Sequence, residues 1–153
     1  MSELELQAYL HWRIPLAAAM GVRVRSVSPA RVELQAPLAP NINNDEMAFG
    51  GSIVAVAMLA AWTLLFVREQ GAGSNARLVI QHGSMSYERP ITDDFAAISE
   101  LADEARYRRF RLTLARHGRA RIALGTVLEQ DGLRVGAFEG AFVAVSERSA
   151  QLR

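Results

Sequence analysis

Residues 49–67, FGGSIVAVAMLAAWTLLFV, form an uninterrupted run of 19 residues without a charged side chain. A run of this length is close to the roughly 20 apolar residues with which a helix crosses a lipid bilayer. It also fits a helix that is buried on all sides inside a soluble fold. We favour the buried helix, because the rest of the chain supplies amphipathic strands whose apolar faces need something apolar to cover.

Alternating apolar and polar residues predict strands on both sides of this run. The expected strands cover residues 21–27, 31–36, 76–89, 95–102, 119–130 and 133–146, and further helices are expected at 3–13 and 103–117. The first two strands form a hairpin, and the last two meet at a tight Asp131-Gly132 turn. Six antiparallel strands around one apolar helix make an α+β layered fold.

Two local features complete this expectation. Gly83 lies in the middle of the long strand at 76–89, where a glycine predicts a bend or a bulge. Asn43, Asn44 and Asp45 precede the apolar run and are residue types that cap helices, so one of them is expected to cap it.

The composition is that of one globular domain over residues 1–153, with a polar tail at 147–153: 50% of the residues are hydrophobic, 22% are charged, and the net charge is +1. The chain has no cysteine and three widely spaced histidines. We therefore expect no metal and no other cofactor. Residues 1–6 include Glu3 and Glu5, whereas a signal peptide would carry positive charge there. A cytoplasmic protein is therefore expected.

Residues 37–52, PLAPNINNDEMAFGGS, resemble the start of the central helix in hotdog-fold thioesterases. More narrowly, they are similar to the thioesterase domain at the C-terminus of YiiD-type acetyltransferases. In that domain a PLAPN loop leads to AFGGS, and a strand of the type VIQ…Y.RP follows. Here the strand motif is VIQ at 79–81 and YERP at 87–90. The resemblance covers nearly the whole chain and implies a hotdog fold, in which a six-stranded antiparallel sheet wraps one long helix.

The residue types at the start of the apolar helix suit thioester chemistry. Gly50 and Gly51 lack side chains, so a ligand carbonyl can approach their backbone N–H groups at the positive end of the helix dipole. Thioester hydrolysis needs such donors where negative charge develops on the carbonyl oxygen. The resemblance places an amide that orients water or substrate near Asn43, with Asn41 as the other candidate. Alternatively, the glycines serve only close packing, and the asparagines only turns.

The general base is less clearly marked. Many hotdog thioesterases carry an acid about eight residues into the helix, where this chain has Ala57-Met58-Leu59. The loop also departs from the YiiD-like pattern, which favours His, Lys and Gly at the positions of Asn44, Asp45 and Glu46. Asp45 and Glu46 are therefore candidate bases, unless they only face water.

A histidine on the long strand offers another route to a base. His82 stands where related domains tend to have an aspartate, and it can activate water unless it is a hydrogen-bonded residue of a dimer interface. Ser84 shares its strand face by period-two spacing and is a candidate nucleophile, although neighbours two apart on one strand rarely reach hydrogen-bond geometry.

Seven arginines crowd residues 106–121. They form either a solvated face, neutralised by the preceding acids, or a site for coenzyme A phosphates or for the acidic surface of an acyl carrier protein. Nucleic acid is not expected, because the net charge is near zero and no aromatic residues interleave the arginines. Together with the motif residues, this gives the expected substrate contacts: Asn41, Phe49, Arg89, Pro90 and Arg109.

The sequence thus predicts a thioester hydrolase that acts on acyl-CoA or on acyl carrier protein. The expected assembly is a homodimer or a dimer of dimers, because the sites of this fold lie where two subunits meet. The rival interpretation is a non-catalytic acyl-thioester-binding or assembly subunit of the same fold, which the missing helix acid supports. Four side chains of the apolar helix suit the wall of a site for a medium or long acyl chain, unless they serve only as core: Ile53, Val56, Met58 and Trp62.

Overall fold

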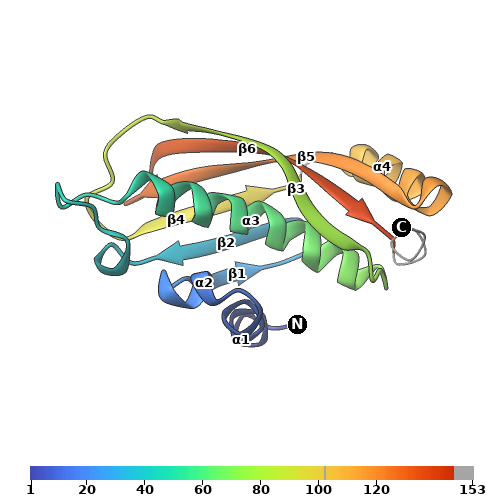
Figure 1. The fold of residues 1–153 in the computed structure, drawn as a ribbon, viewed down its shortest axis with the longest axis horizontal. Coiled ribbons are helices and arrows are strands. Elements are labelled where there is room, and N and C mark those ends of the chain that lie inside the picture. The colour runs from blue at the N-terminus through green and yellow to red at the C-terminus, as the bar shows by residue number, and fades with distance from the viewer. Residues whose placement is uncertain (102, 147–153) are drawn as a thin grey trace.

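A computed structural model describes residues 1–101 and 103–146 of the chain, so the polar tail expected at 147–153 lies outside the described residues. Figure 1 shows one sheet curved around one long helix. The helices are α1 (Glu3–Arg13), α2 (Pro15–Ala19), α3 (Gly50–Gly71) and α4 (Glu104–His117), with a 3-10 helix at Ala39–Asn41. The strands are β1 (Arg23–Val27), β2 (Arg31–Ala36), β3 (Arg77–Tyr87), β4 (Phe95–Glu100), β5 (Arg119–Gln130) and β6 (Leu133–Val145).

The six strands form one antiparallel sheet in the order β1-β2-β4-β5-β6-β3. This confirms the predicted six-stranded antiparallel sheet and both hairpins. Asp131 (φ 52°) and Gly132 (φ 74°) are both left-handed, as a two-residue hairpin turn requires. Because β3 crosses over to pair only with β6, it lies at the opposite edge of the sheet from β1.

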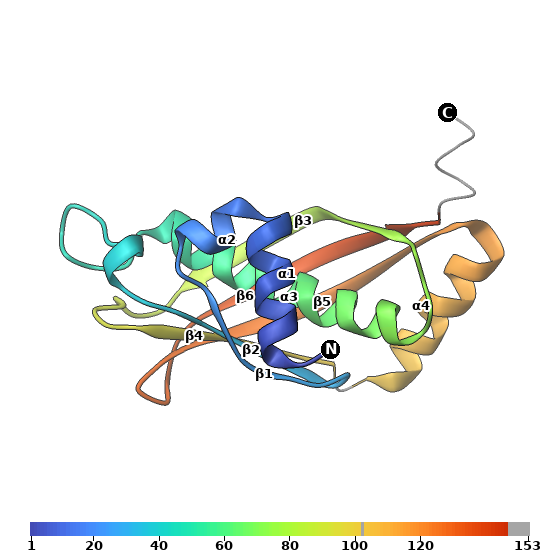
Figure 2. The same ribbon diagram turned by 90° about the horizontal axis from the view of Figure 1, so that it is seen from below.

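The uncharged run forms α3, which the sheet covers on one side (Figures 1 and 2). Its side chains toward the strands are fully buried, among them Val56, Ala60 and Leu64. By length and composition this helix also passes as a membrane span, yet here it is the core helix, as expected. The opposite side of the helix is less covered, since Val54, Met58 and Trp62 are only half-buried.

The short helix α2 is not among the helices that the sequence predicts, which are at 3–13, along the apolar run and at 103–117. Pro15 is the first residue of α2, where a proline is well tolerated because the missing N–H would have no intrahelical partner. The second predicted helix at 103–117 is confirmed as α4. Asp103 caps it by accepting from the backbone N–H of Arg106, and Gly118 ends it in the left-handed conformation.

Two local predictions are wrong. None of Asn43, Asn44 and Asp45 caps α3, because the helix begins only at Gly50 and Phe49 is the N-cap, without a side-chain cap hydrogen bond. The irregularity in β3 lies between Ile80 and His82 and not at Gly83. Gly83 instead allows close packing, because a Cβ at this position would lie only 2.9 Å from the Phe138 ring.

Candidate active site at the start of the central helix

The first turn of α3 presents backbone donors. The first intrahelical hydrogen bond runs from Ile53 N to Phe49 O (3.0 Å), so the N–H groups of Gly50, Gly51 and Ser52 have no partner within the helix. The N-cap residue offers no side-chain acceptor in their place. These donors lie at the positive end of a 22-residue helix and are suited to bind a polarised carbonyl oxygen.

Tyr87, the last residue of β3, fixes this turn from the side of the sheet. Its hydroxyl donates to the backbone oxygen of Gly50 at 2.9 Å. The same ring limits what can replace Gly50, since a Cβ there would lie 3.5 Å from the Tyr87 hydroxyl oxygen. A Cβ on Gly51 would collide with the ring of Phe49, which is itself 57% exposed. The absence of side chains therefore keeps the approach to these amides open.

The loop before α3 is held closed by the two asparagines that the sequence singled out. Asn41 is buried, its Nδ2 donates to Met20 O (2.8 Å) and Pro37 O (2.7 Å), and its backbone oxygen accepts from Phe49 N (2.7 Å). Asn43 Oδ1 accepts from the backbone N–H of Asp45 (2.8 Å) and of Met47 (3.0 Å). Both side chains shape the loop, and the Asn43 oxygen has both of its acceptor positions occupied.

The two loop acids are accessible. Asp45 and Glu46 are exposed at the tip of the loop, whose ends are joined by the bridge between Ile42 and Ala48 directly before the helix. Glu46 adopts a left-handed backbone conformation with φ 59°. This explains why the YiiD-like pattern favours glycine at this position.

The register with β6 places His82 and Ser84 opposite Ala141 and Glu139, although His82 also lines a small hollow with Val54 and Met58 of α3. Side chains of residues paired across antiparallel strands project from the same face of the sheet. The alternating residues Phe138 and Phe142 belong to the core around α3. A single chain therefore does not bring His82 or Ser84 to the Gly50 amides. Sequence reasoning missed Glu139, because only the strand register places this acid opposite Ser84.

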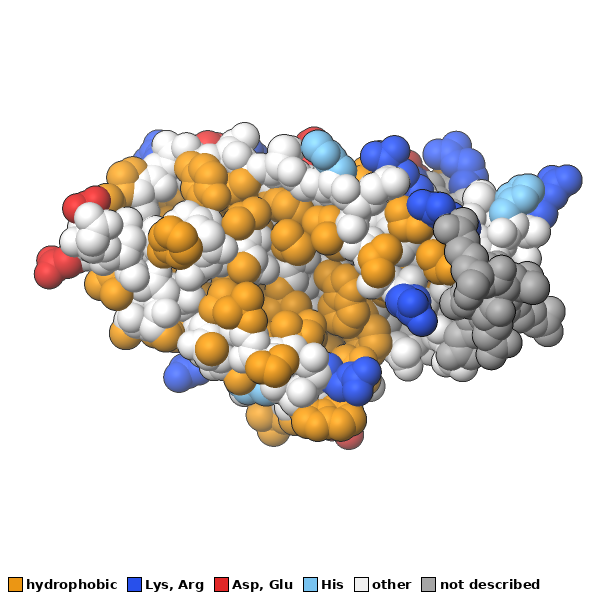
Figure 3. Space-filling model, in the orientation of Figure 1, with side chains coloured by type: hydrophobic (Ala, Val, Ile, Leu, Met, Phe, Trp, Pro, Cys, Tyr) orange, Lys and Arg blue, Asp and Glu red, His pale blue; other side chains and the backbone are white. Residues whose placement is uncertain are grey.

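An apolar cavity of about 540 Å³ lies along the open side of α3. It is lined by Met58 and Trp62 of α3, by Leu78 and Ile80 of β3, and by Leu16 of α2. Figure 3 shows the surrounding apolar side chains as an orange area on this face of the molecule. Of the helix residues expected to form an acyl-chain wall, Met58 and Trp62 line the cavity, whereas Ile53 and Val56 are buried in the core.

The remaining candidate contacts lie at opposite ends of α3. Phe49, Arg89 and Pro90 are exposed at the end where the helix begins, the latter two just beyond Tyr87. Arg109 is exposed on α4, at the far end of the helix (Figure 1). Within residues 1–101 and 103–146, no group of three or more His, Asp or Glu side chains is placed to hold a metal ion.

Of the acids that precede the arginine cluster, Asp103 pairs with Arg106 of the cluster (3.9 Å), whereas Glu100 and Glu104 are engaged elsewhere. Glu100 binds Arg31 (3.0 Å), and Glu104 forms a bidentate pair with Arg68 (2.8 Å to each nitrogen). The hydrogen bond from Arg68 holds the pKa of Glu104 below its usual 4.5. Within the cluster itself, Arg111 donates to the buried Glu69 at 2.7 Å. The expected local neutralisation of the arginines is therefore incomplete.

An antiparallel six-stranded sheet wrapped around a long apolar helix defines the hotdog fold. The sequence model of the family described as "Putative thioesterase (yiiD_Cterm)" matches residues 3–146. The chain belongs to this family, as its motifs predicted.

Solved structures agree with this assignment. A protein of unknown function from Chlorobaculum tepidum TLS is 27% identical, with a TM-score of 0.88 over 95% of this chain and 94% of that chain. A putative thioesterase from Shewanella oneidensis is 26% identical, with a TM-score of 0.82 over 94% and 96%. A probable thioesterase from Pseudomonas aeruginosa, at 22% identity and a TM-score of 0.81 over 94% and 96%, shows the shared fold alone.

Proposed function

We propose that this protein hydrolyses acyl thioesters carried by coenzyme A or by an acyl carrier protein. The observation that carries the proposal is the uncapped first turn of α3, where the N–H groups of Gly50 and Gly51 have no partner within the helix, together with an apolar cavity that begins farther along the same helix, at Ala55. Met58, which lines that cavity, is eight residues beyond Gly50 and thus about 12 Å along the helix axis. A medium-length acyl chain can enter the cavity while its carbonyl stays at the first turn.

In the proposed reaction, the N–H groups of Gly50 and Gly51 bind the thioester carbonyl oxygen. A base removes a proton from water, and the resulting hydroxide adds to the carbonyl carbon to form a tetrahedral oxyanion. The amides stabilise this oxyanion, because they donate where the negative charge develops. Collapse of the intermediate breaks the carbon–sulfur bond and releases a carboxylic acid and a thiol, which takes up the proton.

Asp45 and Glu46 are the bases that the geometry favours over His82. Both carboxylates are exposed on the loop whose ends are pinned at the start of α3, whereas His82 lines a small hollow farther along that helix, with Val54 and Met58. Asn43 contributes in this proposal by donating from its Nδ2 to substrate, because its oxygen already accepts two backbone hydrogen bonds. A role in accepting a hydrogen bond from the attacking water would break the loop turn.

The proposed functional unit is a dimer formed through β3. This edge strand pairs only with β6, and Val79 (44% exposed) and Ile80 (36% exposed) lie on it next to the open side of α3. The other sheet edge is less open, since Gln7 Oε1 accepts from Val24 N (3.0 Å) in β1. A second copy that adds its β3 in an antiparallel manner extends the sheet and covers the apolar face.

Thiol release from a panel of acyl-CoA and acyl carrier protein thioesters tests the function. We expect turnover by the wild type, a loss of at least about tenfold in kcat for Asp45→Asn or Glu46→Gln, and a change of less than about twofold for His82→Ala. A loss with His82→Ala alone would move the base to β3. No turnover on any thioester while acyl-CoA still binds would overturn the hydrolase and favour the acyl-binding subunit, which the absence of an acid at Ala57-Met58-Leu59 supports.

A further inference from the structure

The outward face of α4 combines positive charge with one exposed apolar side chain. Arg109, Leu112 and Arg116 follow the helical spacing of one stripe, with Arg108 beside them. The three arginines are exposed, and Leu112 is 71% exposed. The opposite face of the helix packs through Tyr107, Phe110 and Leu114, so this stripe is not needed to hold α4 on the sheet.

The charge of this stripe is only partly offset within the chain, where Arg108 acts on Glu104 and Arg109 on Asp103 through charge alone. Among the residues that the structure describes, no ion pair involves Arg108, Arg109 or Arg116. Asp103 lies nearest to a different arginine, Arg106, at 3.9 Å. The stripe extends over about 12 Å from Arg108 to Arg116, which matches a helix-sized acidic surface better than a single phosphate group.

The distance between α4 and the Gly50 amides decides which subunit a carrier bound at α4 can serve. The 22 residues of α3 span about 33 Å from the Gly50 end to the α4 end. A phosphopantetheine arm has a backbone comparable to roughly four or five extended residues and reaches about 16 Å. A carrier bound at α4 therefore cannot deliver its acyl group to the Gly50 amides of the same chain.

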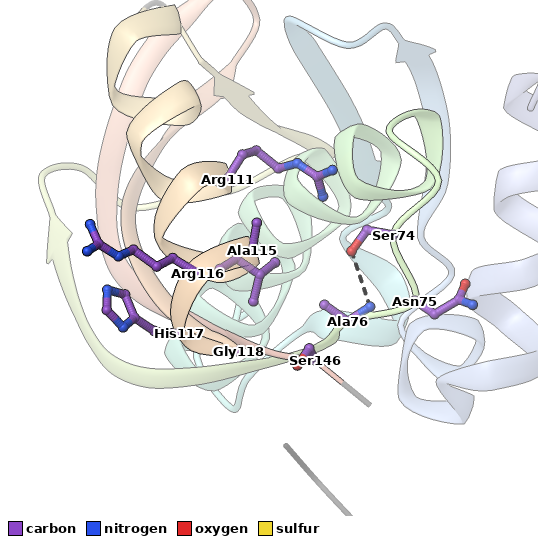
Figure 4. A pocket seen from close by; sticks show the side chains of 10 residues that line it. Ser74, Asn75, Ala76, Arg111, Ala115, Arg116, His117, Gly118 and Ser146 are labelled. Atoms are coloured by element: carbon purple, nitrogen blue, oxygen red, sulfur yellow. Dashed lines mark hydrogen bonds between the residues drawn. The ribbon is translucent and has the colours of Figure 1, made fainter. Parts of the chain in front are cut away.

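Antiparallel pairing of two β3 strands brings the α4 end of one copy close to the Gly50 amides of the other. If pairing uses the whole strand, Arg77 of one copy lies beside Tyr87 of the other, and Tyr87 contacts Gly50. Directly before Arg77, Ser74-Asn75-Ala76 line a hollow of about 550 Å³ whose other wall includes Arg116 and His117 of α4 (Figure 4). In the proposed dimer, this hollow lies between α4 of one copy and the Tyr87 end of β3 in the other.

We infer that an acidic acyl carrier protein docks on the stripe Arg108, Arg109, Leu112 and Arg116 of one subunit and presents its acyl thioester to Gly50 and Gly51 of the other. This inference rests on the proposed function and on the dimer. The exposed Leu112 favours a protein over a free nucleotide, because an apolar contact ringed by arginines is typical of a protein interface. Carboxylates of an acidic helix suit the arginine forks.

Binding of apo acyl carrier protein tests the docking surface independently of hydrolysis, since the apo form carries neither arm nor thioester. The probe is a purified type II fatty-acid acyl carrier protein in its apo form, titrated by calorimetry. We expect Arg108→Glu/Arg109→Glu/Arg116→Glu to weaken binding at least about tenfold, because reversed charges repel the acidic partner. The matched control Arg13→Glu/Arg23→Glu/Arg25→Glu makes the same charge change on α1 and β1 and should bind within about twofold of the wild type.

Equal weakening by both triple variants, or no binding by the wild type at low salt, would overturn the inference. Leu112→Ser should weaken binding without altering net charge, and circular dichroism verifies that α4 is intact in each variant.

For hydrolysis, the α4 variant should lose kcat/KM on acyl carrier protein thioesters but keep it on acyl-CoA. A parallel loss on acyl-CoA would assign the arginines to nucleotide phosphates and contradict protein docking. Absence of hydrolysis on both, with apo binding intact, would contradict only the proposed function.

Mixed dimers test delivery between subunits. One chain carries the α4 triple reversal with an intact site, and the other carries an intact α4 with Asp45→Asn/Glu46→Gln. Delivery across the dimer predicts that the mixed dimer regains about half of the wild-type activity on acyl carrier protein thioesters, because the intact α4 serves the intact site. Delivery within one chain predicts no recovery, and that result would overturn the inferred geometry.

Discussion

At the scale of single residues, Glu46 stands out by its backbone. Glu46 and Asp131 are the two non-glycine residues with positive φ in the described part of the chain, and Asp131 belongs to a hairpin turn that favours this conformation. For Glu46, the left-handed conformation costs about 1–2 kcal/mol relative to glycine. A carboxylate kept at a strained position of the loop before α3 is consistent with the role proposed for it.

Glu46→Gly should therefore stabilise the protein. Glycine adds freedom to the unfolded chain, which costs about 0.4–1 kcal/mol of stability, but the relief of backbone strain is larger. We therefore expect the free energy of unfolding to rise by about 0.5 kcal/mol and the Tm by about 1–3 °C. Glu33→Gly in β2 is the control and should lower the Tm. If Glu46 is the base, Glu46→Gly and Glu46→Gln lose activity equally although only the glycine variant is stabilised. A lower Tm for Glu46→Gly would contradict the strain.

Gly51→Ala tests the open approach to the helix amides. The added methyl group displaces the Phe49 ring, and we expect kcat/KM for thioester hydrolysis to fall by about 10- to 100-fold, comparable to the weakening of one oxyanion donor. Gly50→Ala meets Tyr87 only at ordinary contact distance and should cost less. The double variant Gly51→Ala/Phe49→Ala should recover part of the activity, and full activity of Gly51→Ala would rule out this constraint.

At the scale of elements, α4 is attached to the end of α3 by polar contacts between distant parts of the sequence. The buried carboxylate of Glu69 accepts from the Tyr107 hydroxyl (2.8 Å) and from Arg111 (2.7 Å). Arg68 lies over the Tyr107 ring at 3.9 Å and pairs with Glu104. These contacts orient α4 and its outward arginine stripe relative to the core.

This attachment predicts a stability change at alkaline pH. Burial, together with the hydrogen bond to Glu69, raises the pKa of the Tyr107 phenol from 10.0 to about 12. The neutral phenol is thus favoured in the folded state, and the resulting stability is present below pH 10 and lost as the pH rises from 10 to 12. Because solvent screens part of this effect, the loss amounts to about 1–2 kcal/mol. Urea unfolding of Tyr107→Phe should show a variant less stable than the wild type at pH 8, with the gap closing by pH 12. A gap that is constant with pH would contradict the raised pKa.

The elements were largely predictable from the sequence, but several positions within them were not. Period-two alternation located β2 and β5 because their inward side chains are buried and their outward ones are not. The Asn43 cap prediction failed because its side chain closes its own loop, a choice that depends on the tertiary anchor of Asn41. Likewise, the strand spacing that joined His82 with Ser84 could not show which face they occupy, since that depends on the register with β6.

At the scale of the whole molecule, the two ends of α3 carry different surfaces. The Gly50 end presents backbone donors without an intrahelical partner and the loop acids, whereas the α4 end presents Arg108, Arg109 and Arg116, which form no ion pair with the described residues. In one chain these surfaces are separated by the length of the helix. A two-fold dimer through β3 places unlike ends next to each other, so the proposed assembly explains why a single chain contains two surfaces that it cannot use together.

The assembly itself can be tested by its mass in solution. We expect the wild type to elute in light-scattering chromatography at twice the chain mass of 16.8 kDa, or at a multiple of that dimer. Ile80→Asp places a charge on the open edge strand beside the apolar face, where a paired second copy would bury it without a counter-charge. This variant should therefore elute as a single chain. Leu133→Asp likewise replaces an aliphatic side chain with a carboxylate, at the 61% exposed first residue of β6, and should leave the mass unchanged. A wild type of 16.8 kDa at micromolar concentration, or an Ile80→Asp variant that remains dimeric and folded, would show that β3 is not the interface and that carrier delivery between subunits must take another geometry.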